Sequence, residues 1–384
     1  MKQILWLVVT AFVVLSCSGA STTRFDDSDF DKDLPPDEEH VVDKDSDVTD
    51  EGVADRDTVL DENNRLDEDF TSDSDIVIVD DPTWIASGAD GMVALSENGE
   101  KWVYFSLSEQ ETINSVSCNE NGDCLLVGND GGIYRGVGGT VWSKESFSSS
   151  YPLYSLFFNQ TEWLVGGRKE TLFSDKGESW KRLYLSVADG GIAISTVWQI
   201  FKCNNIWFIR GDSAVYSSVD TITWHQWTVD GNNPKITPKG DMLCLADDTF
   251  IVGLNLYSTD GKSWYERKES DISPFADGFE NESMVQGKDG RILLSGFNWN
   301  DDNSLGEIAI RYSDDGAKTW KKSSLPEEFI KSRHIVGSLA TDNNGRWVCV
   351  TQQGDFLLSK DNGASWEVVE QKAGWNIFTV GHRG

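Results

Sequence analysis

The chain has 384 residues and carries 64 acidic against 33 basic side chains, a formal net charge of −31. So large an excess of negative charge repels phosphate backbones, which argues against nucleic acid as a partner. The charge is concentrated near the N-terminus, where Arg24 to Asp81 holds 24 acidic and 5 basic residues, a local net charge of 5 − 24 = −19.

The first 17 residues read as an export signal. Lys2 precedes an apolar run from Ile4 to Leu15, which is too short to span a membrane. Val14-Leu15-Ser16-Cys17 resembles a bacterial lipobox, and this resemblance implies cleavage before Cys17 and a lipid on its sulfur. Cys17 is followed by Ser18 and not by aspartate, and in bacterial lipoproteins this pattern is typical of sorting to the outer membrane. We therefore expect an exported protein on the bacterial cell envelope, attached to the membrane by an N-terminal lipid anchor and facing either the periplasm or the cell surface. The alternative is an ordinary secretory signal with an incidental cysteine.

Residues 18–74 are predicted to be a disordered acidic linker, because they hold many charges and almost no aromatic residues. Asp43, Asp45 and Asp47 have the spacing of the first ligands of an EF-hand loop. However, Val48 stands where that loop needs glycine, and Ala54 where it needs a bidentate glutamate. Weak, diffuse cation association is the simpler expectation, and no metal site or cofactor is predicted.

The rest of the chain, residues 75–384, is a repeat. Its clearest unit is Ser359-Lys360-Asp361-Asn362-Gly363-Ala364-Ser365-Trp366, and related units lie at 313–320, 258–264 and 174–180. Weaker copies end at Trp102, Trp142 and Trp224, so that the seven closing tryptophans are 40, 38, 44, 40, 56 and 46 residues apart. This period is typical of a four-stranded blade, and the Asp, Asn, Gly and Ser residues are typical of a hairpin turn.

A second set of equivalent positions in the seven copies, here called the second column, supports the repeat independently of the closing tryptophans. An apolar run begins in each copy at Trp84, Cys124, Trp163, Trp207, Phe250, Ile292 or Trp347. Four residues later come Gly88, Gly128, Gly167, Gly211, Leu254, Gly296 and Thr351. Both columns predict an all-β, seven-bladed β-propeller in which tryptophans fill the space between sheets and helices are nearly absent. In the third copy, strands are expected at about Tyr154 to Phe158, Trp163 to Gly167, Thr171 to Ser174 and Trp180 to Leu183.

The repeat resembles the Asp-box, or bacterial neuraminidase repeat, with the pattern Ser-x-Asp-x-Gly-x-Thr/Ser-Trp. The sialidases, the sortilin-type receptor domains and the photosystem II stability and assembly factor family contain it, and all are β-propellers. The resemblance implies structural Asp-box roles, on the face away from the ligand, for Ser174, Asp175, Trp180, Ser258, Asp260, Trp264, Ser313, Asp315, Trp320, Ser359, Asp361, Gly363 and Trp366.

Two features of the propeller remain open at this stage. Cys118 and Cys124 flank a turn and could form a disulfide across a hairpin, or remain two buried thiols. The inner strand of the first blade could be Ile76 to Val79 or Trp375 to Val380. We favour the C-terminal strand, which matches Trp198 to Lys202 position by position and closes the ring without an open edge.

The sequence favours a binding or assembly module over an enzyme. The sialidase Arg-Ile-Pro motif is missing, the four histidines form no cluster, and only Arg168, Arg210 and Arg333 could supply an arginine triad. A sialidase-like glycoside hydrolase is the alternative, and a chaperone for an envelope complex is a third hypothesis. As candidate ligand-binding residues for an unknown protein or glycan partner we take Phe297, Trp299, Asp301, Asp302 and Arg333, and we expect a monomer.

Overall fold

The computed structural model describes residues 82–383, except 109, 120, 138–140, 160, 192, 213, 228–240, 246, 248, 253–255, 260–262, 267–278 and 301–303. The predicted signal peptide, Cys17, the acidic linker at 18–74 and the candidate strand Ile76 to Val79 lie outside these residues. So do Asp260 of the fifth repeat and the candidate ligand residues Asp301 and Asp302.

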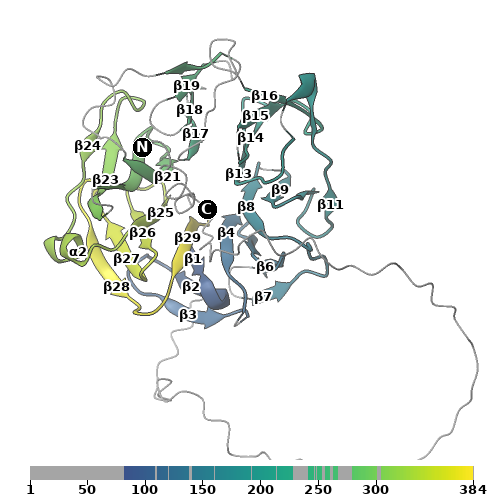
Figure 1. Cartoon of the computed structure of the whole chain (residues 1–384). Coiled ribbons are helices and arrows are strands. Elements are labelled where there is room, and N and C mark those ends of the chain that lie inside the picture. Colours follow the sequence, from purple (N-terminus) through teal and green to yellow (C-terminus); the bar gives the residue numbers. More distant parts are fainter. Residues whose placement is uncertain are drawn as a thin grey trace, which may run out of the picture. The chain divides into compact units, whose positions relative to one another are not determined.

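Seven small antiparallel sheets stand in a ring, which confirms the predicted seven-bladed β-propeller (Figure 1). Blade 1 contains β29 (Ile377–His382), β1 (Trp84–Gly88), β2 (Met92–Ser96) and β3 (Val103–Ser106). Blade 2 contains β4 (Ile113–Cys118), β5 (Cys124–Gly128), β6 (Ile133–Val137) and β7 (Val141–Lys144), and blade 3 contains β8 (Leu153–Phe158), β9 (Trp163–Gly167), β10 (Thr171–Ser174) and β11 (Lys181–Arg182). Blade 4 contains β13 (Gln199–Cys203), β14 (Ile206–Arg210), β15 (Val215–Ser218) and β16 (Thr223–Gln226).

The remaining blades follow the same order from the inner to the outer strand. Blade 5 contains β17 (Met242–Cys244), β18 (Phe250–Val252), β19 (Leu256–Ser258) and β20 (Tyr265–Glu266). Blade 6 contains β21 (Glu280–Gln286), β22 (Ile292–Trp299), β23 (Leu305–Ser313) and β24 (Lys321–Lys322), and blade 7 contains β25 (Val336–Thr341), β26 (Trp347–Thr351), β27 (Asp355–Ser359) and β28 (Glu367–Gln371). In the third blade the four strands fall where the repeat predicts them, except that the outermost begins at Lys181.

Helical structure in the described residues is confined to connections. The α-helix α2 (Glu327–Ser332) lies between blades 6 and 7, and two 3₁₀ turns, η2 (Ala89–Gly91) and η3 (Ala188–Gly190), are three residues long each. A short strand, β12 (Ser186–Val187), leaves blade 3 and pairs in parallel with the outermost strand of blade 4. It covers an edge that would otherwise present unpaired backbone groups.

The repeated aromatic residues form the core between neighbouring blades. All seven residues that begin the apolar runs, from Trp84 to Trp347, are buried, and five of the seven closing tryptophans are at most 7% exposed. Trp142 and Trp180 are partly buried. In one cluster Trp84 and Trp102 of blade 1 pack against Phe356 and Leu358 of blade 7. Each sheet thus buries its apolar faces against the next sheet, which explains why one repeat cannot be stable alone.

The C-terminal strand closes the ring. β29 is the innermost strand of blade 1 and pairs antiparallel with β1, with Trp84 opposite His382 and Ser87 opposite Thr379. This confirms the choice of the C-terminal strand, and Figure 1 places the C-terminus near the centre of the ring. The predicted register was wrong by three residues. Trp207 lies opposite Lys202 in blade 4, but the equivalent Trp84 lies opposite His382 in blade 1, three residues beyond the matched Thr379. A bulge in β29 between the partners of Ser87 and Gly88 accounts for one of these three residues.

Polar side chains on the inner strands link successive blades around the centre. Ser155 Oγ accepts a hydrogen bond from the amide of Ile200 at 3.0 Å, and Asp241 Oδ2 accepts one from Met284 at 3.1 Å. Ser338 Oγ accepts one from Val380 at 3.2 Å, which joins blade 7 to the closing strand. Because these groups are buried, each bond removes the cost of an unsatisfied donor.

The repeated turns are organised by serine and aspartate side chains. In blade 7 Asp361 Oδ1 accepts from Ser359 Oγ and from the amide of Ser365, both at 2.8 Å, and Ser359 Oγ accepts from the amide of Gly363 at 2.8 Å. Blade 6 has the same bonds, with Asp315 accepting from Ser313 and Thr319. The turn therefore fixes the chain direction just before the buried tryptophan.

Two other copies of the turn differ from the expectation. In blade 3 the amide of Gly177 bonds to Ser174 Oγ at 2.8 Å, but Asp175 stands one residue earlier than the aspartates of blades 6 and 7. In blade 4, a weak copy in sequence, Asp220 accepts from Ser218 at 2.9 Å and from the amide of Thr223 at 2.8 Å. Backbone bonds from Thr223 and Ile222 and a bond from Ser218 lower the pKa of Asp220 to about 2.

Two disulfides are present among the described cysteines. Cys118 is bridged to Cys124 across the turn between β4 and β5, the pair that the sequence left open between a bridge and two thiols. Cys203 is bridged to Cys244, which the sequence analysis did not foresee. This second bridge joins the inner strands of blades 4 and 5. Cys349 is a buried free thiol, and burial raises its pKa to about 12.

Candidate functional site

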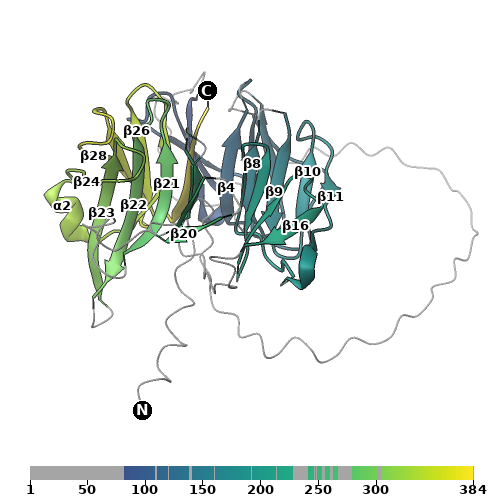
Figure 2. The ribbon, with the colours of Figure 1, turned by 90° about the horizontal axis from the view of Figure 1, so that it is seen from above.

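The strand order gives the ring two chemically different faces. The turns that join the inner to the second strand and the third to the outer strand lie on one face, here called the turn face. The connections from the second to the third strand and from blade to blade lie on the other, here called the loop face. In Figure 2 the C-terminus, which follows β29, marks the turn face at the top of the ring.

Of the candidate ligand residues that the structure describes, two are accessible on the loop face. Trp299 ends β22 and is 39% exposed, with its ring edge-on to Phe297 at a centroid distance of 5.5 Å. Arg333 is exposed just after α2 and has the left-handed conformation, φ 59°. Phe297 is 1% exposed, so its assignment as a ligand residue was wrong. It packs in the core of blades 6 and 7, because residue 297 still belongs to the second strand.

Blade 6 carries the largest extension of this face. β22 and β23 are eight and nine residues long, and their pairing continues to Trp299 opposite Leu305. Phe297 and Phe329 of α2 lie in one apolar cluster, so the hairpin and the helix support each other. The apolar cluster of blades 6 and 7 therefore supports the end of the β22–β23 hairpin, where Trp299 lies.

Exposed aromatic residues distinguish the two faces. Among the described residues, large exposed hydrophobic side chains of the loop-face connections include Tyr151 at 37%, Tyr184 at 85% and Trp299 at 39%. Those at the turn face include the aliphatic Val219 and Ile222 and one aromatic residue, Tyr265 at 49%, which begins the outer strand β20. Three of the four exposed aromatic side chains in the described part of the chain therefore lie on the loop face. Aromatic residues contribute disproportionately to binding energy at protein interfaces. The loop face is therefore the better candidate for recognition.

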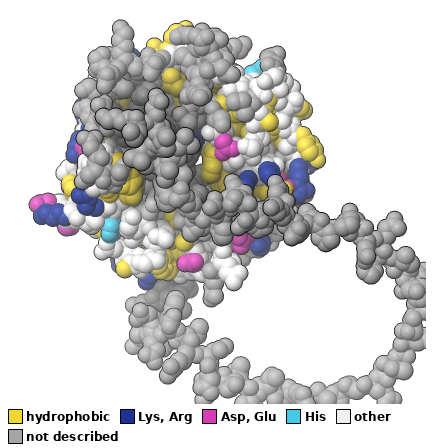
Figure 3. All heavy atoms as spheres, viewed as in Figure 1, with side chains coloured by type: hydrophobic (Ala, Val, Ile, Leu, Met, Phe, Trp, Pro, Cys, Tyr) yellow, Lys and Arg dark blue, Asp and Glu magenta, His cyan; other side chains and the backbone are white. Residues whose placement is uncertain are grey.

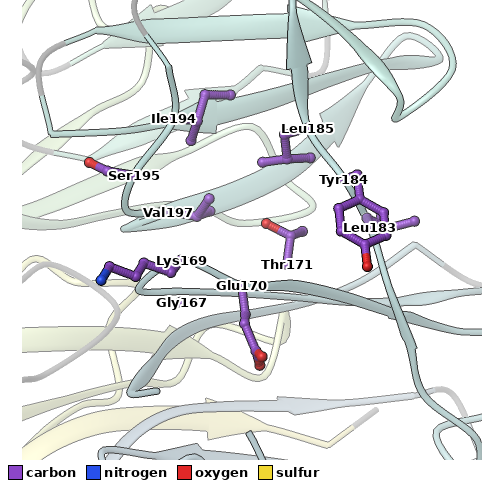
Figure 4. A pocket seen from close by; sticks show the side chains of 10 residues that line it. All are labelled: Gly167, Lys169, Glu170, Thr171, Leu183, Tyr184, Leu185, Ile194, Ser195 and Val197. Atoms are coloured by element: carbon purple, nitrogen blue, oxygen red, sulfur yellow. The ribbon is translucent and has the colours of Figure 1, made fainter. Parts of the chain in front are cut away.

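A small pocket of about 110 Å³ opens on the loop face between blades 3 and 4 (Figure 4). One wall is the turn after β9, and the other is the connection from blade 3 to blade 4. The lining residues are Gly167, Lys169, Glu170, Thr171, Leu183, Tyr184, Leu185, Ile194, Ser195 and Val197. The walls are held together by a hydrogen bond from the amide of Lys169 to the carbonyl of Ser195 at 2.7 Å.

Sequence reasoning missed this pocket. Except for Gly167, its residues lie outside the repeated positions, and the only signal was the long connection from Val187 to Thr196. Lys169 lines the pocket, and three more exposed basic residues, Arg168, Lys181 and Arg182, are next to lining residues or within two positions of them in the chain. Figure 3 shows basic and hydrophobic side chains together at this edge of the ring, over β11.

A buried charged cluster lies where blades 4, 5 and 6 meet. Arg210 and Asp241 are each 1% exposed and Glu282 is 2% exposed. Burial raises the pKa of Glu282 well above its usual range, the neighbouring Glu280 and Asp241 raise it further, and Arg210 opposes them. Because Arg210 is buried, the tripeptide Arg210-Gly211-Asp212 does not present the arginine that adhesion would require.

The structure does not bring Arg168, Arg210 and Arg333 together. Arg210 is buried, Arg168 follows β9 and Arg333 follows α2. The elements β9 and α2 lie on opposite sides of the ring (Figure 1). His334 Nδ1 lies 2.5 Å from Asp355 Oδ2, and Thr351 and Gln371 also donate to that carboxylate. These bonds tie the connection after α2 to blade 7.

Metal binding and membrane spanning can be assessed for residues 82–383 outside the gaps given above. In that part of the chain, no three or more His, Cys, Asp and Glu side chains are grouped so that they could hold a metal ion. None of its helices is long and apolar enough to cross a membrane.

Comparison with solved structures shows the fold. The extracellular domain of the putative one-component system BT4673 from B. thetaiotaomicron is 10% identical over 77% of this chain and 37% of that chain, with a TM-score of 0.52. The WD40 β-propeller domain of Doa1 is 11% identical over 77% of this chain and 90% of that chain, with a TM-score of 0.51. YCF48 bound to a D1 peptide is 18% identical over 67% of this chain and 81% of that chain, with a TM-score of 0.49.

No protein-family model matches the sequence, and no curated protein is similar to it. At identities this low, structural likeness establishes architecture and leaves function to the site itself. The chain is a seven-bladed β-propeller, and within its described residues the loop face carries three of the four exposed aromatic side chains and the pocket beside Lys169.

Proposed function

We propose that the chain is an exported lipoprotein whose propeller binds a protein partner through the loop face. The observation that carries this proposal is that three of the four exposed aromatic side chains in the described part of the chain, Tyr151, Tyr184 and Trp299, lie on that face. Tyr151 and Tyr184 belong to connections between blades, and Trp299 ends a strand. Such a face suits recognition, because the scaffold holds the side chains in place before binding.

Three features support the finer parts of the proposal. Cys17 in its lipobox-like context supports a lipid anchor on the envelope. The two disulfides, Cys118 to Cys124 and Cys203 to Cys244, suit an oxidising compartment. The serine and aspartate bonds in the turns of blades 6 and 7 support the resemblance to Asp-box propellers. That family places these turns away from the ligand, in agreement with a loop-face site.

The test is partner capture from the envelope of the source cell. Detergent-solubilised full-length protein would be immobilised and the bound proteins quantified by mass spectrometry. The variant Tyr151→Ala/Tyr184→Ala/Trp299→Ala should lose the specific partner, while the turn-face control Val219→Ala/Ile222→Ala should retain it. Equal capture by both variants would refute a loop-face site.

A fluorogenic sialoside assay and a glycan array, run with the same protein, test the glycan alternatives. If the protein hydrolyses the sialoside and this activity depends on loop-face residues, the chain is a sialidase-like glycoside hydrolase and the binding proposal is wrong. Selective glycan binding without protein capture would assign the face to carbohydrate.

A further inference from the structure

The pocket between blades 3 and 4 has a definable ligand chemistry. We propose that it receives one branched aliphatic side chain from an acidic segment of the protein partner. This inference rests on the proposed function and adds the partner's chemistry to it.

The size and walls of the pocket suit an aliphatic side chain. About 110 Å³ corresponds to roughly three or four waters at their liquid volume of about 30 Å³ each. Four branched aliphatic side chains, Leu183, Leu185, Ile194 and Val197, line it. Burying a leucine or isoleucine against them removes apolar surface from water on both sides.

Two polar side chains that line the pocket, Glu170 and Ser195, already form hydrogen bonds within the chain. Glu170 accepts from Arg182 Nε at 2.8 Å and from Ser149 Oγ at 2.5 Å. Ser195 Oγ donates to Asp212 at 2.5 Å. A ligand that brought only polar groups would have to compete with these bonds. An aliphatic side chain that contacts Leu183, Leu185, Ile194 and Val197 would leave these bonds intact.

The mouth of the pocket presents a cation. Lys169 is exposed, its ammonium lies 5.5 Å from the centre of the Tyr151 ring, and it forms no ion pair within the described part of the chain. Its backbone has φ 59°, an uncommon conformation for a long side chain, and its amide is bonded across the pocket to Ser195. The backbone beneath this charge is therefore held in place.

The surrounding charge indicates an acidic partner. The whole chain has a net charge of −31, yet the segments that form the pocket and its edge carry Arg168, Lys169, Lys181 and Arg182 against Glu170, Asp189 and Asp212, a local excess of 4 − 3 = 1 positive charge. Opposite charge across an interface accelerates encounter and selects partners. Tyr184, 85% exposed beside the aliphatic wall, can cover the inserted side chain from one flank.

The probe is the peptide acetyl-Asp-Asp-Leu-Asp-Asp-amide, titrated into full-length protein by isothermal calorimetry. Two comparison peptides replace the leucine by glycine, or all four aspartates by lysines. We expect the leucine peptide to bind at least about tenfold more tightly than either comparison peptide, with an affinity that falls as salt rises. Equal binding of the leucine and glycine peptides would overturn the proposal.

Variants test whether binding occurs in this pocket. Lys169→Glu removes the cation, and Ile194→Trp fills the pocket from a partly buried position; each should weaken the leucine peptide at least about tenfold. The matched control is Lys372→Glu, since Lys372 also lies over an aromatic ring, 5.3 Å from the centre of Tyr104, on another part of the loop face. Its affinity should stay within about twofold of wild type. Unchanged unfolding midpoints would show that the variants are folded, and wild-type affinity in Lys169→Glu would refute the assignment.

Two further outcomes separate this inference from the proposed function. If no peptide binds while the triple aromatic variant still loses its captured partner, the pocket proposal fails and the loop-face function stands. If binding appears only after deletion of residues 24–81, the pocket belongs to the chain's own acidic segment, and an external partner is ruled out for it.

Discussion

The closing strand gives the most demanding test of the fold. Truncation after Gln371 removes β29, in which Ile377, Phe378 and Val380 are 1%, 7% and 5% exposed. Burying three such side chains stabilises the native state by roughly 5–9 kcal/mol, at about 1.5–3 kcal/mol each. Because a domain has only about 5–15 kcal/mol of net stability, the truncated chain should not fold cooperatively. The loss would include the backbone bonds between β29 and β1.

The assay is urea unfolding followed by tryptophan fluorescence and circular dichroism. Ile377→Ala gives a graded version and should cost about 2–5 kcal/mol. Val368→Ala on β28 is the control, because that side chain is 37% exposed and its loss should change stability by less than about 0.5 kcal/mol. A truncated chain with the wild-type midpoint and cooperativity would refute closure by the C-terminus.

Four further predictions concern the core, the turns, the buried acid and the anchor. Trp366→Ala should cost about 3–5 kcal/mol, because the ring is 6% exposed, whereas Trp299→Ala should change the free energy of unfolding by less than about 0.5 kcal/mol; equal urea midpoints would contradict this. Burial opposes ionisation of Asp361, but hydrogen bonds from Ser365 and Ser359 outweigh it and lower the pKa of this carboxyl group. Asp361→Asn should therefore destabilise the protein at pH 7, and the difference in stability from the wild type should shrink as the pH falls through the lowered pKa. A difference in melting temperature that does not depend on pH would argue against this role. The raised pKa of Glu282 makes stability fall, and not rise, with increasing pH, because the folded chain keeps a proton that the unfolded chain releases near pH 4.5. Above that pH the free energy of unfolding of the wild type should decrease by up to about 1.4 kcal/mol per pH unit. Glu282→Gln should therefore have a higher melting temperature than the wild type at pH 7 and the same melting temperature near pH 4. Cys17→Ala should leave an uncleaved precursor that no longer partitions into detergent, and continued partitioning would rule out the lipid anchor.

The sequence determined the repeat, and through it the fold class and the core. A hairpin turn needs small and polar residues, a blade buries its aromatic side chains against the next blade, and both requirements recur with a period that local patterns reveal. For this reason Trp163, Trp207 and Trp347 could be assigned to the core before any coordinates were known. The choice of the C-terminal strand also followed from the sequence, because an unpaired edge is unfavourable.

Only the tertiary structure decided the register of β29, the bridge between Cys203 and Cys244, and the pocket beside Lys169. Each depends on how two repeats meet, and contacts between residues far apart in the chain leave no periodic signal. Phe297 shows the same limit. Whether this side chain is buried or exposed depends on whether β22 ends before or after residue 297. The sequence does not locate strand ends to within one residue. Trp299 and Arg333 lie on the loop face as the position of their loops suggested, but the conformation of the chain between blades 3 and 4 was set by packing against both.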